Sequence, residues 1–378
     1  APLIVTTLLF ILGLALLVGG AELLVRGASR IAMLLGIAPL IVGLTVVAFG
    51  TSAPELAVTG VASMRGDPDL ALGNVVGSNV LNVLLILGAS ALVAPLVVQQ
   101  RLVRSGVPFM IGVTALVVVL SLDRVLTRLE GALLLAGGLT YTTLLVLRAR
   151  RHASPRLPPS AGPPAPAGSL PLNAVLMLGG LGLLVLGSRW VVAGAEAMAA
   201  ALGVPQLVIG LTVVAAGTSL PELATSVVAS ARGQRDIAVG NIIGSNIFNL
   251  LIVLGAAATL SDVGLDVPLS ALTFDLPVML GVAIACLPIF ITGLRIDRVE
   301  GCLFLAFYAI YTGYLVLDAA DHHALPALQE GVFFVALPLT LLTLAVAALR
   351  ARSRPRDPAG DATDEASGAP RPPDPGSD

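Results

Sequence analysis

Charged side chains are scarce in this chain. Only 12% of its 378 residues are Asp, Glu, Lys or Arg, whereas 56% are apolar, and the mean hydropathy is +0.96. Because a soluble domain has about 25% charged residues, this composition excludes an ordinary water-soluble enzyme. Lysine is absent, so all 21 basic residues are arginine. The two cysteines, Cys286 and Cys302, lie in apolar stretches, which indicates neither a disulfide nor a metal–thiolate site.

Long apolar runs take up most of the sequence. A membrane-spanning helix needs about 20 mostly apolar residues, and a barrel strand would instead show about 10 residues of alternating polarity. The first run lacks a preceding basic segment and continues into Glu22 and Arg26, which favours a true span over a secretory signal. We expect eleven spans, at 3–25, 33–64, 70–95, 106–122, 129–148, 172–192, 200–231, 237–260, 272–293, 299–317 and 330–349.

The arginines indicate the orientation of these spans, because cytoplasmic loops are enriched in basic residues. If residue 1 lies outside, 17 of the 21 arginines fall in cytoplasmic loops and the C-terminal tail. The four that then fall outside are Arg65, Arg124, Arg128 and Arg189. We therefore expect a multi-pass protein of the cell membrane, with its N-terminus outside and its C-terminus in the cytoplasm.

The sequence contains an internal repeat. Residues 20–88 align with 187–255 at a constant offset of 167, and about half of the positions are identical. GTSAPEL at 50–56 matches GTSLPEL at 217–223, and GNVVGSNVLN at 73–82 matches GNIIGSNIFN at 240–249. Five spans precede the linker, so the second copy would enter the membrane from the opposite side. Inverted repeats of this kind build ion sites near the midplane of many secondary transporters.

These patterns predict an all-α polytopic membrane protein of two inverted five-helix repeats, with one extra C-terminal transmembrane helix. The first half would cover 1–151, with its repeat motif at about 36–92, and a Pro- and Gly-rich cytoplasmic linker would follow at 152–171. The second half would cover 172–318, with its repeat motif at about 203–259. The extra helix would lie within 319–349, and the polar residues 350–378 would form a disordered tail.

Each repeat places a glutamate, Glu55 or Glu222, deep inside an apolar span, where an ionisable group costs at least about 2.5 kcal/mol. The preceding prolines, Pro54 and Pro221, remove a backbone N–H and free the carbonyl four residues earlier. Thr51 and Glu55 are four residues apart, which predicts that both lie on one helix face. As alternatives to a role in an ion site, each glutamate could be a protonated structural residue and each proline could kink its helix for packing alone.

The second motif of each repeat carries a polar stripe at helical spacing, formed by Asn74, Ser78 and Asn82 and by Asn241, Ser245 and Asn249. For Ser78, Asn82, Ser245 and Asn249 we favour contact with an ion. For Asn74, Asn79 and their counterparts, interhelical hydrogen bonding is an equal alternative. Carboxylates, hydroxyls, amides and carbonyls are hard oxygen donors without His or Cys, a set that suits Ca²⁺, Na⁺ or Mg²⁺. A flexible cage of protein oxygens favours Ca²⁺ over Mg²⁺, and Na⁺ could occupy the same oxygens.

At these motifs the chain resembles the cation/calcium exchanger superfamily, specifically its prokaryotic sodium/calcium exchangers, over about residues 3–317. The resemblance implies a ten-helix core in which Glu55 and Glu222 bind Ca²⁺ together with the carbonyls of Thr51 and Thr218. It also implies that the sodium sites use Ser52, Ser78 and Ala48 on one side and Ser219, Ser245 and Ala215 on the other, with Asn82 and Asn249 lining the middle. The first and sixth spans would slide past a fixed core.

The sequence departs from the family at Asn249, where members often carry Asp, so the site has one titratable group fewer. The eleventh span is a further departure, and its two alternative roles are a peripheral helix and an oligomer contact. The linker is too short for the calcium-sensing domain of animal relatives, so we expect no such regulation.

The resulting hypothesis is a secondary active antiporter that exports Ca²⁺ against inward Na⁺, with three Na⁺ per cycle implied by the resemblance. Such exchange is electrogenic and would use the membrane potential. The alternatives are Ca²⁺/H⁺ exchange, a channel, and an intramembrane hydrolase that uses the paired glutamates as acid and base. We expect no enzymatic activity, no cofactor and no nucleic-acid partner. The transported ions and the lipid bilayer are the expected partners.

Overall fold

The computed structural model describes residues 3–151, 169–203, 215–291, 294–320 and 325. In the first half it contains α1 (Leu3–Leu35), α2 (Pro39–Val42), η1 (Gly43–Val47), α3 (Ala48–Thr51), α4 (Ala53–Met64), α5 (Pro68–Leu81), η2 (Asn82–Leu87), α6 (Gly88–Val93), η3 (Leu102–Gly106), α7 (Val107–Leu120) and α8 (Arg128–Arg151), where η marks a short π-helical turn. In the second half it contains α9 (Leu170–Ala201), α11 (Ala215–Gly217), α12 (Leu220–Ala231), α13 (Arg235–Phe248), η5 (Asn249–Val253), α14 (Leu254–Leu260), η6 (Ala271–Asp275), α15 (Leu276–Ile291) and α16 (Arg298–Ala319).

The predicted fold class, a helical polytopic membrane protein, is confirmed. Over the described residues, eight helices are long and apolar enough to cross a membrane. A ninth span results if the helices Pro39–Thr51 and Ala53–Met64, which meet at a 45° bend, are taken together. These nine correspond to nine predicted spans. Of the predicted span at 200–231, residues 204–214 lie outside the described residues. Residues 152–168 of the linker predicted at 152–171, the span at 330–349 and the tail also lie outside them.

Two features of the backbone differ from the prediction. Helix α1 continues to Leu35 instead of ending near residue 25, and it stops at Gly36, whose φ of +64° cannot continue a right-handed helix. Two short antiparallel strand pairs also join the halves. Strand β1 (Leu96–Val97) pairs with β4 (Arg295–Ile296), and β2 (Val125–Leu126) pairs with β3 (Leu265–Asp266). Strands of two residues carry no alternating pattern that a sequence could reveal.

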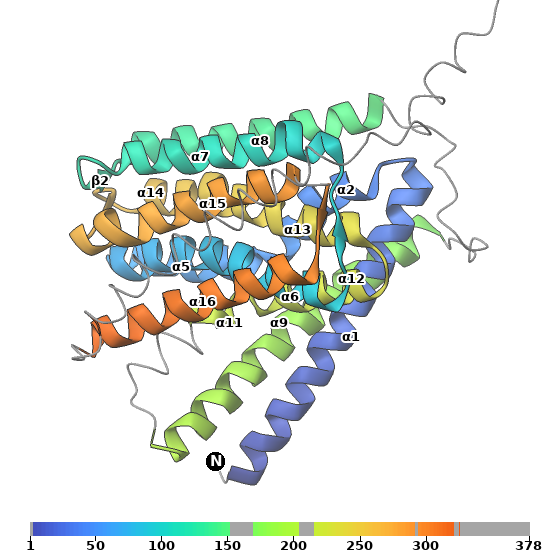
Figure 1. The fold of residues 1–378 in the computed structure, drawn as a ribbon, viewed down its shortest axis with the longest axis horizontal. Coiled ribbons are helices and arrows are strands. Elements are labelled where there is room, and N and C mark those ends of the chain that lie inside the picture. The colour runs from blue at the N-terminus through green and yellow to red at the C-terminus, as the bar shows by residue number, and fades with distance from the viewer. Residues whose placement is uncertain (1–2, 152–168, 204–214, 292–293, 321–324, 326–378) are drawn as a thin grey trace, which may run out of the picture.

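Helices α1 and α9 form a crossed pair that projects from the rest of the bundle (Figure 1). Glycines allow their backbones to touch: a Cβ on Gly20 would lie 2.7 Å from the carbonyl oxygen of Gly180, and one on Gly13 would lie 2.9 Å from that of Gly187. Small residues permit this close approach in membrane helices. Because residues 13 and 20 correspond to 180 and 187 in the repeat alignment, the contact is nearly symmetric.

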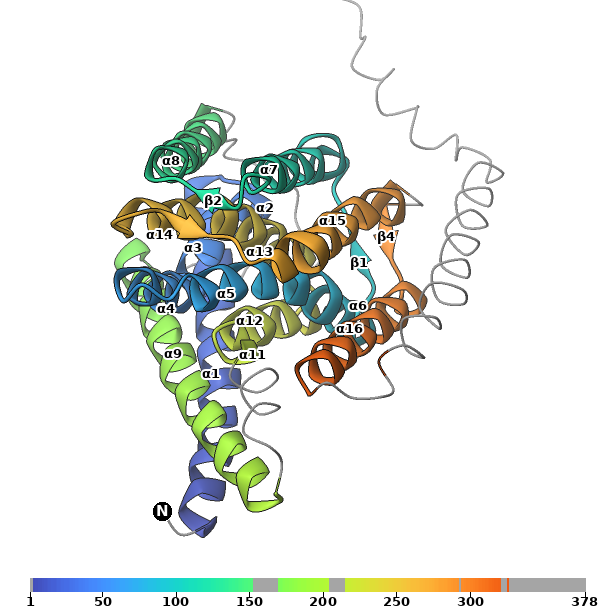
Figure 2. The same ribbon diagram turned by 90° about the vertical axis from the view of Figure 1, so that its left-hand side faces the viewer.

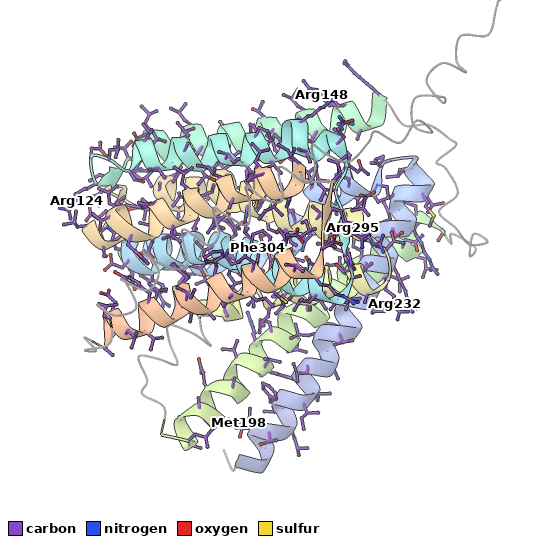
Figure 3. All side chains as sticks on the ribbon, in the orientation of Figure 1. Arg124, Arg148, Met198, Arg232, Arg295 and Phe304 are labelled. Atoms are coloured by element: carbon purple, nitrogen blue, oxygen red, sulfur yellow. The ribbon has the colours of Figure 1, made fainter. Side chains whose placement is uncertain are left out.

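The centre of the bundle consists of the two polar-striped segments and the helices that precede them. Segment α5–η2–α6 and segment α13–η5–α14 are the most buried candidate spans, with 78% and 100% of their apolar windows inside the protein. Helices α7, α8, α15 and α16 flank them on two sides (Figure 2) and expose apolar side chains such as Leu129, Leu133 and Val299, as lipid-facing helices do. Arg148, Arg232 and Arg295 lie toward one end of the bundle and Arg124 toward the other (Figure 3).

Candidate cation site

The site is built where two helices break. Helix α3 ends at Thr51, Ser52 leaves helical geometry, and α4 begins at Ala53. The second repeat breaks in the same way between α11 and α12, at Thr218 and Ser219. A proline stands within the first two positions of both α4 and α12. The helices tolerate its missing N–H there, because the first N–H groups of a helix have no partner inside the helix. Thr51 and Glu55, which the spacing predicted on one continuous helix, therefore lie on two helices that meet at a 45° bend.

Glu55 and Glu222 lie in the first turns of α4 and α12, and both are fully buried. Each carboxylate accepts a hydrogen bond from a serine of the opposite half: Ser219 Oγ donates to Glu55 Oε1 at 2.8 Å, and Ser52 Oγ donates to Glu222 Oε1 at 2.8 Å. Each serine stands three residues before the glutamate of its own half. Through this exchange each carboxylate is held by the half of the protein that carries the other carboxylate.

Helices α5 and α13 bring further polar side chains to the carboxylates. The hydroxyls of Ser78 and Ser219 are 3.0 Å apart, and Ser245 lies near Glu222. Asn82 and Asn249 begin the π-helical turns η2 and η5, which widen the helix at these points. Such π turns inside α-helices are frequent at functional sites. Asn82 donates its amide hydrogen to Asn246 Oδ1 at 3.0 Å.

Several buried polar atoms of this cluster lack a hydrogen-bond partner among the described residues: Glu55 Oε2, Glu222 Oε2, Asn82 Oδ1, Ser245 Oγ, and Asn249 Oδ1 and Nδ2. A buried polar group without a partner is costly, and each such group in a folded protein calls for an explanation. Five of the six are oxygens, and they come from both halves. A bound cation is a partner that such oxygens would accept.

The structure brings together most of the predicted site residues. The carboxylates, Ser52, Ser78, Ser219 and Ser245 form one buried cluster, and Thr51 lies near Glu222 as Thr218 lies near Glu55. The carbonyl of Ala48 accepts from the N–H of Ser52 at 3.0 Å, and Thr51 Oγ1 lies 3.4 Å from the same carbonyl oxygen. Ala215 is the first residue of α11, and its side chain lies outside the described atoms.

The carbonyl of Gly217, which Pro221 was expected to free, has a partner from another helix. Ser188 of α9 donates its hydroxyl to this oxygen at 2.5 Å. The sequence offered no signal for this contact, because Ser188 corresponds to Ala21 in the first repeat and has no counterpart there.

The structure also separates the roles of the asparagines that the sequence left open. Asn74 and Asn241 hydrogen-bond to other helices, and Asn246 bonds to Asn82, whereas Asn79 donates to the Val75 carbonyl of its own helix at 2.8 Å. Interhelical hydrogen bonding therefore describes the first three. The cross-helix contacts could not be deduced from spacing, because they depend on how the halves approach each other.

Comparisons with known proteins agree with this geometry. The sodium/calcium exchanger protein family matches residues 5–147 and 172–317. CaxA of Alkalimonas amylolytica is 41% identical over 84% of this chain and all of its own length, and the sodium/calcium exchanger MaX1 of Methanosarcina acetivorans is 33% identical over 81% of this chain and 97% of its own. The solved structure of the sodium/calcium exchanger from Methanococcus jannaschii has a TM-score of 0.71 at 30% identity, covering 82% of this chain and 98% of that one. The chain belongs to the sodium/calcium exchanger protein family.

Proposed function

We propose that this protein is a secondary active antiporter that exchanges Ca²⁺ for Na⁺ across the cell membrane by alternating access. One observation carries the proposal: two fully buried carboxylates from opposite halves, each held by a serine of the other half, each keep one oxygen without a partner among the described residues. Ionisable groups at membrane depth mark ion pathways when they face the interior of a bundle. Exchangers of the same family, MaX1 and the Methanococcus jannaschii protein, are named for Na⁺ and Ca²⁺.

In this proposal Glu55 and Glu222 bind Ca²⁺ with the backbone carbonyls of Thr51 and Thr218. Two ionised carboxylates carry the charge that neutralises one Ca²⁺, and the neutral oxygens complete a shell of six to eight ligands. Both threonines stand at helix breaks, where carbonyls at the end of a helix lack partners inside that helix. Na⁺ would use the serine hydroxyls and the carbonyls of Ala48 and Ala215, with Asn82 and Asn249 between the two sides, so the two cations compete for shared oxygens.

The proposed organisation is two inverted halves, at 1–151 and 172–318, joined by the linker at 152–171. The matching contacts of Gly13 with Gly187 and of Gly20 with Gly180 support this organisation. The two strand pairs also support it, because each pairs a strand of the first half with a strand of the second half. We place the N-terminus outside, since the end of the bundle with Arg148, Arg232 and Arg295 would then face the cytoplasm (Figure 3).

The equivalence of the two carboxylates argues against an enzymatic role. A hydrolase needs one glutamate as acid and one as base, and these roles require different environments. Here each glutamate accepts one bond from a serine across the symmetry and leaves its second oxygen without a partner in the described structure. We therefore propose a transporter without a cofactor, for which Ca²⁺ and Na⁺ are substrates.

The test is ⁴⁵Ca²⁺ uptake into proteoliposomes across whose membrane a Na⁺, K⁺ or H⁺ gradient of equal size is imposed. We expect an outward Na⁺ gradient alone to drive uptake, and an inside-positive potential to increase it, because exchange of one Ca²⁺ for three Na⁺ moves one net charge. Uptake driven by a pH gradient and indifferent to Na⁺ would instead establish Ca²⁺/H⁺ exchange. Uptake without any gradient of a second ion would indicate a channel.

A further inference from the structure

Two asparagines connect the halves through matched chains of hydrogen bonds. Asn74 of α5 donates to Thr59 Oγ1 at 2.8 Å, and its Oδ1 accepts from Thr218 Oγ1 of the opposite half at 3.2 Å. Asn241 of α13 donates to Ser226 Oγ at 3.0 Å, and its Oδ1 accepts from Thr51 Oγ1 of the opposite half at 3.1 Å. We call these the Asn74 relay (Thr59, Asn74, Thr218) and the Asn241 relay (Ser226, Asn241, Thr51).

Each relay begins one helical turn after a glutamate of the site. Thr59 follows Glu55 by four residues on α4, and Ser226 follows Glu222 by four residues on α12. The amide nitrogen of Asn74 also lies 3.5 Å from the backbone carbonyl oxygen of Glu55. Because a carbonyl can only accept, this neighbour favours the orientation in which the amide nitrogen faces α4 and the amide oxygen faces Thr218.

Each relay ends on a threonine at a helix break. Thr51 is the last residue of α3, and Thr218 lies between α11 and α12. The carbonyl of such a residue is not fixed by the regular hydrogen bonds of a helix interior. A side-chain anchor from another helix is therefore able to decide where this carbonyl points.

We propose that Asn74 and Asn241 are positioning residues for Ca²⁺ binding. Each asparagine ties the glutamate-bearing helix of its own half to the threonine of the opposite half, and so fixes the distance between a carboxylate and the carbonyl that faces it. This inference rests on the proposed function, in which Thr51 and Thr218 supply carbonyl ligands. It assigns a role to two residues that do not themselves touch the ion.

The two relays differ in burial, and this difference predicts which of them has the larger effect on Ca²⁺ affinity. Asn241, Ser226 and Thr51 are all fully buried, whereas Asn74 and Thr218 are half-buried. Losing a hydrogen bond costs more where water cannot replace the missing partner. The Asn241 relay should therefore affect Ca²⁺ affinity more strongly than the Asn74 relay.

Other helices offer matched controls. Asn173 of α9 is a buried asparagine that donates to the Ser169 carbonyl at 3.1 Å and belongs to neither relay. Thr114 of α7 is a buried threonine that bonds within its own helix, to the Met110 carbonyl at 2.8 Å. Asn173→Ala and Thr114→Val thus remove similar atoms without breaking a relay.

The test is isothermal titration of the purified full-length protein with Ca²⁺ in Na⁺-free buffer. We expect Asn74→Ala and Asn241→Ala to weaken binding by about tenfold or more, which corresponds to about 1.4 kcal/mol, with the larger loss for Asn241→Ala. Asn173→Ala should stay within about twofold of the wild type. Thermal unfolding in detergent identifies any variant that fails to fold.

Threonine variants provide the milder second test. Thr218→Val should weaken binding as Asn74→Ala does, Thr218→Ser should retain most of the affinity because it keeps the hydroxyl, and Thr114→Val should bind as the wild type does. The double variant Asn74→Ala with Thr218→Val should bind no worse than the weaker single variant, because both break one relay.

The proposal is overturned if Asn74→Ala and Asn241→Ala bind Ca²⁺ as Asn173→Ala does, or if the losses of Asn74→Ala and Thr218→Val add. The proposed exchange reaction fails differently. Wild-type protein that binds Ca²⁺ but shows no Na⁺-driven flux would refute the coupling ion and leave the relays measurable. Wild-type protein that binds no Ca²⁺ would refute the proposed substrate.

Discussion

Replacing Glu55 or Glu222 by glutamine removes one negative charge from the site while keeping the shape of the side chain. Carboxylate oxygens lie about 2.3–2.6 Å from a bound Ca²⁺. At that distance, the attraction between a divalent cation and a single negative charge is about 3 kcal/mol even at the dielectric constant of water. Both carboxylates are fully buried, so the effective dielectric constant is lower and this value is a lower bound. We therefore expect either variant to bind Ca²⁺ at least about 100-fold more weakly than the wild type.

The assay is Ca²⁺ titration of the purified protein, followed by ⁴⁵Ca²⁺ flux in proteoliposomes. Glu22→Gln is the matched control, because Glu22 lies on α1, pairs with Arg26 and Arg232, and takes no part in the site. This variant should bind and transport Ca²⁺ as the wild type does, since surface ion pairs contribute little. Equal Ca²⁺ affinities for Glu55→Gln and Glu22→Gln would refute the reasoning.

Three further changes test separate parts of the structure. Gly20→Ala should destabilise the α1–α9 crossing by about 1–3 kcal/mol, because its Cβ would lie 2.7 Å from a backbone oxygen. Gly19→Ala places its Cβ within 4 Å of no atom of the described residues, so it should leave the unfolding temperature unchanged. Ser188→Ala should lower thermal stability by about 1 kcal/mol through loss of the bond to the Gly217 carbonyl, and an unchanged unfolding temperature would contradict that bond. Asn249→Asp adds a carboxylate among the atoms without a partner in the described structure, so Ca²⁺ binding should tighten at alkaline pH and become more sensitive to acid. Ca²⁺ titration at several pH values measures this, and a pH response equal to that of the wild type would count against it.

The sequence predicted the parts of the fold that follow from the cost of burial in a membrane. Long apolar runs identified nine spans because the bilayer admits few other structures, and the isolated Glu55 and Glu222 were conspicuous because charge at that depth is expensive. The repeat then indicated that the two glutamates occupy equivalent places. Each of these signals is local or depends on identity between two stretches, so it can be recognised in the sequence without the three-dimensional structure.

The sequence could not predict the contacts that cross between the halves. Ser52 stands three residues before Glu55 in the chain, but it donates to Glu222 of the other half. The partners of Asn74 and Asn241 depend on how α5 packs against α11 and α13 against α3. The π-helical turns that begin at Asn82 and Asn249 change the register by one residue without any marker in the sequence. All of these features follow from packing, which periodicity and composition do not encode.

The measurement closest to the central claim is anomalous X-ray scattering from crystals of this protein soaked with Sr²⁺ as a heavier substitute for Ca²⁺. We predict a single strong peak within coordination distance of Glu55 Oε2 and Glu222 Oε2, with that peak absent from crystals of Glu222→Gln. A peak bound to one carboxylate alone, or located outside the space between the two halves, would contradict the claim that both glutamates hold the same ion.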